Sequence, residues 1–150
     1  MKEIKFTVFG EPKAKGRPRF FAAKVGPGKK PFVRTYTPKE TVEAEQDVRV
    51  QSLKTRPKTL ILGSISMTID VYRKIPKSLS KTKIQDAEDK KLLPISRPDW
   101  DNYGKLVCDA LNGVYYKDDS QITEAIVRKF YSSSPRLEVT ISYQEMEGGE

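Results

Sequence analysis

Two aspartates and a lysine near the start of a predicted helix are the residues of this chain best suited to hydrolytic chemistry. Asp99 and Asp101 stand two positions apart, and Lys105 and Asp109 follow Asp101 at steps of four. Such steps place Asp101, Lys105 and Asp109 on one stripe of an α-helix. The sequence therefore predicts carboxylates and an amine in a row on one side of this helix.

A second acidic pair, Asp118 and Asp119, can join this row if the chain after it lies beside the helix. Converging carboxylates repel one another, which raises their pKa values unless a cation neutralises them. Mg²⁺ or Mn²⁺ prefers oxygen ligands, polarises a phosphodiester and lowers the pKa of bound water. Lys105 can orient that water or neutralise charge that develops on the phosphate. The set therefore suits metal-dependent phosphodiester hydrolysis.

Purely structural roles for the same residues stay open at this point. Asp101 can be a helix N-cap, and its stripe with Lys105 and Asp109 can be a solvated ladder of ion pairs. Asp118, Asp119 and Ser120 can form an ordinary turn. Spacing alone favours neither reading.

Composition narrows the chemistry and favours nucleic acid as a partner. The 150 residues include 28 Lys and Arg against 20 Asp and Glu, for a net charge of +8. A polyphosphate is the commonest target of such a surface, and the chain lacks the basic amphipathic helix that a membrane surface would require.

The absence of histidine excludes a His base, a His ligand and a Ser-His-Asp triad. The single cysteine, Cys108, is predicted to be a core residue and excludes an intramolecular disulfide. No signal peptide or long apolar run is present, so we expect a cytoplasmic protein.

The elements that position these residues are predicted from periodicity and turn signals. The length favours one domain over residues 1–150. Thr37 as N-cap, Pro38 and Glu40 predict a helix start, and residues 74–95 read as a surface insertion. Helices are expected at 38–54, 80–92 and 101–112, and strands at 2–9, 60–72, 122–131 and 137–143, with the last two strands forming a hairpin. The tail, residues 145–150, is expected to be disordered. This order predicts an α+β, two-layer fold with a mixed sheet of about four strands and helices mainly on one face.

The acidic motifs resemble those of the RusA family of Holliday junction resolvases, which occur in bacteria and their prophages. The family pattern is a basic lead-in, Asp-x-Asp-Asn, a lysine four residues after the second Asp, Asp-Ala-Leu, and then Asp-Asp-x-Gln. In this sequence these are Arg97, Asp99-Trp100-Asp101-Asn102, Lys105, Asp109-Ala110-Leu111 and Asp118-Asp119-Ser120-Gln121. The resemblance covers residues 97–143 well and the opening strand and the loop that follows it more loosely. The motifs are specific together and weak singly.

The resemblance implies a homodimeric, Mg²⁺-dependent endodeoxyribonuclease of DNA recombination and repair that cuts four-way junctions symmetrically. Carried over by position, Asp99, Asp101 and Asp119 bind metal and Lys105 is the catalytic lysine. Asp118 is the alternative to Asp119 as a ligand. A twofold dimer suits a junction with approximate twofold symmetry. The competing interpretation is a non-catalytic, basic nucleic-acid-binding protein with structural aspartates. A PD-(D/E)xK nuclease ranks lower, because that pattern sets the acid and lysine two apart on a strand.

Residues 11–36 form a basic segment whose many Gly and Pro residues predict an irregular loop. Its cations are expected to contact phosphates, together with one from the lead-in: Lys13, Lys15, Arg17, Arg19, Lys29, Lys30 and Arg97. Phe20 or Phe21 either wedges at the branch point or anchors the loop to the core.

Overall fold

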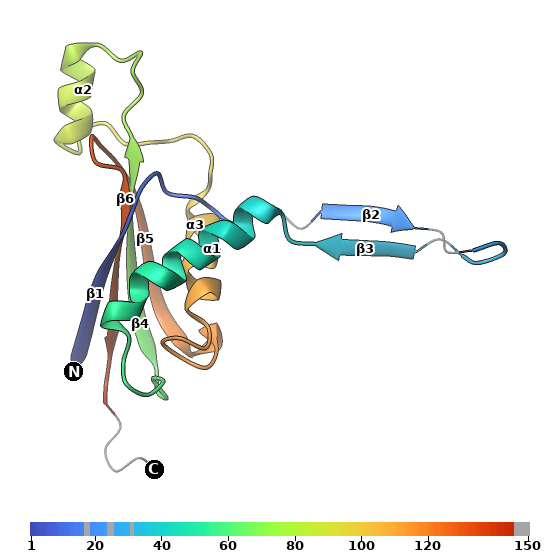
Figure 1. The fold of residues 1–150 in the computed structure, drawn as a ribbon. Coiled ribbons are helices and arrows are strands. Elements are labelled where there is room, and N and C mark those ends of the chain that lie inside the picture. The colour runs from blue at the N-terminus through green and yellow to red at the C-terminus, as the bar shows by residue number, and fades with distance from the viewer. Residues whose placement is uncertain (17–18, 24–25, 31, 146–150) are drawn as a thin grey trace.

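The structure is a computed structural model that describes residues 1–16, 19–23, 26–30 and 32–145 (Figure 1). Arg17 lies outside the described residues, as do positions 146–150 of the predicted disordered tail. The expectations for Phe20 and Phe21 concern side chains that are also outside this description.

A four-stranded mixed sheet forms the body of the protein. Its strands lie in the order β1-β6-β4-β5, where β4 and β5 are parallel and the other neighbours are antiparallel. The predicted α+β fold with one mixed sheet is confirmed. The strands are β1 (Lys2–Phe9), β4 (Ile65–Lys74), β5 (Ile122–Ser132) and β6 (Arg136–Tyr143).

The predicted hairpin between the last two strands is wrong, because β4 lies between β5 and β6. The inward side chains of β4 explain its central place: Ile65, Met67, Ile69 and Val71 are all at most 1% exposed. A strand this apolar on its helix-facing side stabilises the fold most when neighbours flank it on both edges. The strand also begins later than predicted, since residues 60–64 form a loop in which Ile61 bridges to Tyr116.

Two helices, α1 (Lys39–Ser52) and α3 (Trp100–Leu111), cover one face of the sheet (Figure 1). The inner side of α3 carries Tyr103, Leu106, Val107, Ala110 and Leu111, all of which are buried. Gly104 allows α3 to approach β5 closely, because a Cβ there would lie 3.3 Å from Cγ2 of Val127. The opposite face of the sheet is lined by polar side chains such as Thr68, Asp70, Arg128 and Thr140.

The helix starts were predicted with mixed success. Helix α2 (Lys81–Glu88) begins as expected after Ser80, whose hydroxyl accepts a hydrogen bond from the backbone N–H of Lys83 at 3.3 Å. The predicted cap of α1 is wrong by one residue: Pro38 occupies the N-cap position with an extended ψ of 145°. The chain is still extended there because it has just left a strand that ends at Tyr36.

The basic segment contains a hairpin, β2 (Arg19–Ala23) and β3 (Phe32–Tyr36), so the prediction of an irregular loop is wrong. The strands pair antiparallel from Arg19 opposite Tyr36 to Ala23 opposite Phe32. Two of the glycines, Gly26 and Gly28, have φ of 76° and 77° and lie in the connection rather than in the strands. The hairpin projects away from the sheet and helices (Figure 1).

Candidate active site

Helix α3 presents the predicted acidic residues at its first turn. Asp99 occupies the N-cap position and Asp101 lies in the first turn, and both residues are exposed. The structural alternative that made Asp101 the N-cap is therefore wrong. In the described chain the Asp99 side chain makes no capping hydrogen bond, so its carboxylate is not engaged by the helix end. Lys105 follows one turn later, about 6 Å along the axis.

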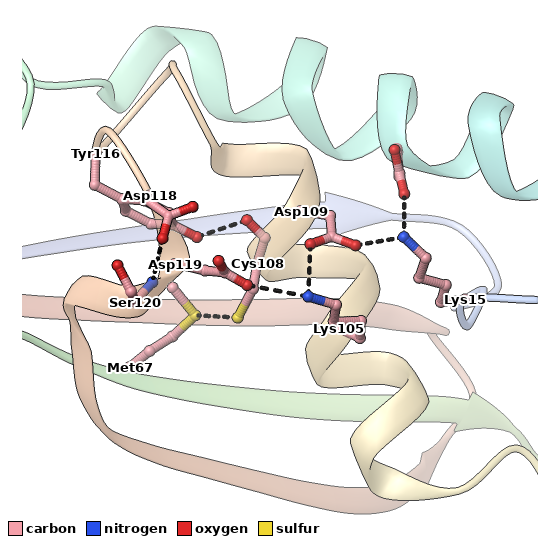
Figure 2. Close-up of polar contacts among 10 residues, drawn as sticks. Lys15, Met67, Lys105, Cys108, Asp109, Tyr116, Asp118, Asp119 and Ser120 are labelled. Atoms are coloured by element: carbon pink, nitrogen blue, oxygen red, sulfur yellow. Dashed lines mark hydrogen bonds and ion pairs between the residues drawn. The ribbon is translucent and has the colours of Figure 1, made fainter. Parts of the chain in front are cut away.

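Lys105 connects this helix to the second acidic motif. Its Nζ lies 3.1 Å from Oδ1 of Asp109 and 3.1 Å from Oδ2 of Asp119 (Figure 2). The hydrogen bond to Asp109, and then that to Asp119, raises the pKa of Lys105, so the amine is charged at neutral pH. The structure thus brings Lys105, Asp109 and Asp119 together.

The turn that carries Asp119 is held by Gln121, which the sequence analysis cited only as part of a motif. Its Oε1 accepts hydrogen bonds from the backbone N–H groups of Lys117 (3.0 Å) and Asp118 (3.2 Å). Its Nε2 donates to the carbonyl oxygens of Ile61 (2.8 Å) and Gly63 (3.1 Å). The two donors and both lone pairs of this amide are therefore used in fixing the turn.

Asp118 and Asp119 have different surroundings in this turn. The Asp118 carboxylate accepts a hydrogen bond from the backbone N–H of Ser120 at 3.1 Å, and hydrogen bonds from Ser120 lower its pKa. Asp118 thus fulfils the turn role that spacing had left open. Asp119 instead points toward Lys105 (Figure 2). The Asp119 carboxylate therefore contacts the lysine of α3, and the Asp118 carboxylate contacts its own turn.

Lys15 occupies a different environment from an exposed, phosphate-binding lysine. Its Nζ pairs with Oδ2 of Asp109 and lies 3.5 Å from Oε1 of Glu45, and its side chain is 25% exposed (Figure 2). Its backbone N–H donates to the carbonyl oxygen of Asn102 on α3 at 3.0 Å. The hydrogen bond with Asp109 raises the pKa of Lys15. Lys15 therefore joins the start of the basic segment to α1 through Glu45 and to α3 through Asn102 and Asp109.

The segment before Asp99 is held by two cations that the sequence analysis missed. Lys129 Nζ donates to the carbonyl oxygens of Ser96 (3.0 Å) and Pro98 (3.1 Å), and Arg73 Nη1 donates to the Ser96 carbonyl oxygen at 3.0 Å. Arg73 and Lys129 lie on the neighbouring strands β4 and β5, and no local pattern in the sequence marks them. Together they fix the backbone that leads into α3.

The other predicted DNA contacts are spread along the basic segment and the lead-in. Lys13, Lys29, Lys30 and Arg97 are exposed, and the backbone of Arg19 begins β2. Lys29 and Lys30 lie in the connection of the projecting hairpin, so these cations attract a polyanion along the basic segment and the lead-in.

The donor set fits a hard divalent cation, although its members are not gathered around one point. Asp99, Asp101 and Asp119 supply only carboxylate oxygens, the ligands that Mg²⁺ and Mn²⁺ prefer. Within the residues that the structure describes, no three His, Cys, Asp or Glu side chains form a ready-made metal centre. Asp119 is paired with Lys105, while Asp99 and Asp101 remain exposed. None of the described helices is long and apolar enough to cross a membrane.

The sequence matches a known protein family and a bacterial relative. The family model described as Endodeoxyribonuclease RusA matches residues 10–142. A relative, the "Uncharacterized protein YqaN" of Bacillus subtilis (strain 168), is 47% identical over 140 residues, which cover 92% of this chain and 94% of the relative. Both matches extend across the N-terminal basic segment as well as the acidic motifs.

Proposed function

Because the chain belongs to the RusA family of endodeoxyribonucleases, we propose that it is a structure-selective nuclease that resolves Holliday junctions. The proposed reaction is Mg²⁺-dependent hydrolysis of phosphodiesters at symmetric positions, in DNA recombination and repair. The observation that carries this proposal is the position of Lys105, which joins the helix with Asp99 and Asp101 to the turn with Asp119.

Asp99, Asp101 and Asp119 would hold the divalent ion in this proposal. When bound, Mg²⁺ would polarise the phosphodiester and lower the pKa of a bound water. Lys105, held cationic by its carboxylate partners, is placed to neutralise charge that develops on the phosphate. Asp109 orients Lys105 and does not act on the substrate itself. Since the site lacks histidine, proton transfer would pass through water and carboxylates.

The exposed cations would bind the DNA backbone in this proposal. Lys13, Lys29, Lys30 and Arg97 are assigned to phosphates, and Arg17 and Arg19 are assigned with them by their place in the basic segment. Symmetric cutting of two strands requires two sites, so we propose that the single RusA-like domain works as a homodimer in the cytoplasm.

Asp101→Asn tests the proposal on a labelled four-way junction and a linear duplex, each with Mg²⁺ or a chelator. Wild type should cut the junction only with Mg²⁺. The variant should lose cleavage by at least about 100-fold, because it removes a metal-binding charge. Its junction affinity should be kept or tightened, since less negative charge faces the phosphates. Asp89→Asn, the same change at the exposed C-cap of α2, is the matched control and should cut like wild type.

Cleavage by Asp101→Asn at the wild-type rate would show that the proposed site is wrong. Junction binding by a wild-type protein that never cuts, with Mg²⁺ or Mn²⁺, would favour the competing interpretation of a binding protein with structural aspartates. Sedimentation of the wild type with and without junction tests the homodimer, which a stable monomer in the cutting complex would contradict.

A further inference from the structure

Trp100, the only tryptophan of the chain, lies between the two candidate metal-binding residues Asp99 and Asp101. It is 63% exposed, whereas tryptophan side chains are highly buried on average. Two further apolar side chains of the preceding segment, Leu93 and Ile95, are 45% and 96% exposed. Exposed apolar side chains therefore precede and enter the segment that carries the two candidate metal-binding residues.

The backbone that presents Trp100 is well fixed. Lys129 donates hydrogen bonds to the carbonyl oxygens of Ser96 and Pro98, and Trp100 is the first residue of α3. The next turn of the helix is packed, since Tyr103 is 1% exposed and Gly104 lies against Val127. A large flat side chain on such a backbone loses little conformational entropy when it binds a ligand.

Resting on the proposed function, we propose that the Trp100 indole stacks on an unstacked base of branched DNA beside the phosphate to be cut. Aromatic side chains bind bases in this way with little regard to sequence, because every base has a π-face. A branch point offers bases with an open face, which the interior of a duplex does not. The neighbouring Asp99 and Asp101 place the indole next to the backbone segment where hydrolysis is proposed.

A second copy of the chain suits this surface less well than a base does. Asp99 and Asp101, the residues before and after Trp100, are both exposed. A dry protein interface over Trp100 would remove water from these two like charges, which is costly without paired cations. A nucleotide instead can meet the carboxylates through a divalent ion at its phosphate while its base covers the indole.

Fluorescence gives a direct assay because all indole emission of the wild type comes from Trp100. The protein is titrated with four-way junction and with linear duplex, once in chelator, where no cleavage occurs, and once in Mg²⁺ at times short against cleavage, where the proposed divalent ion can meet the phosphate. We expect the junction to quench the emission strongly and the duplex to quench it little. Trp100→Leu should weaken junction binding about tenfold and leave duplex binding unchanged, and Trp100→Phe should lie between wild type and Trp100→Leu.

A matched control moves the indole to the last turns of α1. Val50 is 64% exposed there, close to the 63% of Trp100. In the double variant Trp100→Phe with Val50→Trp, we expect the junction to leave the emission unchanged. Urea unfolding of Trp100→Leu checks that the fold is intact, as expected for a change at an exposed position.

Two results would overturn this inference. One is wild-type junction affinity of a folded Trp100→Leu variant. The other is emission that responds to protein concentration and not to DNA, which would place Trp100 in a contact between copies. Quenching by the junction in a wild-type protein that never cuts it, with Mg²⁺ or with Mn²⁺, would instead refute the nuclease proposal and leave the stacking contact standing.

Discussion

Replacement of Lys15 by methionine should loosen the base of the basic segment from α3. Lys15 and Asp109 are 25% and 17% exposed at their side chains, and Glu45 adds a second carboxylate at 3.5 Å from the Lys15 amine. Methionine keeps much of the aliphatic stem but removes the charge. The expected result is a lower free energy of unfolding, because Asp109 loses one of its two lysine partners.

The size of the effect follows from partial burial. Two unit charges about 4 Å apart interact by about 4 kcal/mol at an effective dielectric constant of 20. The desolvation of both groups offsets part of this attraction, and water at the exposed parts of the two side chains screens a further part of it. We therefore expect a coupling energy of about 1.5–2 kcal/mol, within the usual range for hydrogen bonds to charged groups.

A double-mutant cycle with Lys15→Met, Asp109→Asn and the combined variant measures that coupling by urea unfolding. The control cycle uses Lys39 and Glu43, an ion pair at 3.8 Å whose side chains are 85% and 62% exposed. For the control pair we expect at most about 0.5 kcal/mol.

A Lys15–Asp109 coupling no larger than that of the control pair would refute the reasoning. The pH dependence gives a second check. The hydrogen bond with Asp109 raises the pKa of Lys15 in the folded state above its ordinary value of 10.5. The contribution of the pair should therefore be complete below pH 10.5 and lost as pH rises through the raised pKa.

Two further outcomes follow from the site and the core. Lys129→Met should lower junction cleavage about tenfold with little change in junction affinity, because the Ser96 and Pro98 carbonyls lose the amine that fixes the backbone before Asp99. Lys129→Arg should restore part of the cleavage rate, and a wild-type cleavage rate for Lys129→Met would contradict this positioning role. Burial raises the pKa of Cys108 from 9.0 to about 11. At pH 8 an aromatic disulfide reagent should therefore react about 100-fold more slowly with the native thiol than with the urea-unfolded thiol, and equal reaction rates would refute the assignment of Cys108 to the core.

The main elements of the fold were predictable because each carries a local signal. Alternation along β1 and β6 and the apolar stripe of α3 are visible within a few residues of sequence. The hairpin of the basic segment was missed because Gly and Pro density was taken as evidence against strands, whereas Gly26 and Gly28 lie in the connection. The separation of β5 from β6 was missed because a short connection normally joins neighbouring strands.

The site was predictable in its residue types and less so in its contacts. Lys105 lies one turn from both Asp101 and Asp109, so these relations follow from helix geometry. Lys15 and Asp109 are 94 positions apart, and nothing in the local sequence links them. The same holds for Lys129 and the carbonyls before Asp99, because the packing of β5 beside α3 brings them together.

The root of the projecting hairpin has a mechanical consequence. The backbone N–H of Gly16 donates to Oγ1 of Thr41 at 2.9 Å, and a Cβ on Gly16 would meet the same oxygen at 2.9 Å. The neighbouring Lys15 is joined to α3. The point where the chain leaves the body of the protein for this hairpin is thus bonded to both α1 and α3. Because Lys15 pairs with Asp109, and Asp109 pairs with Lys105, a displacement of this point changes the surroundings of the Lys105 amine.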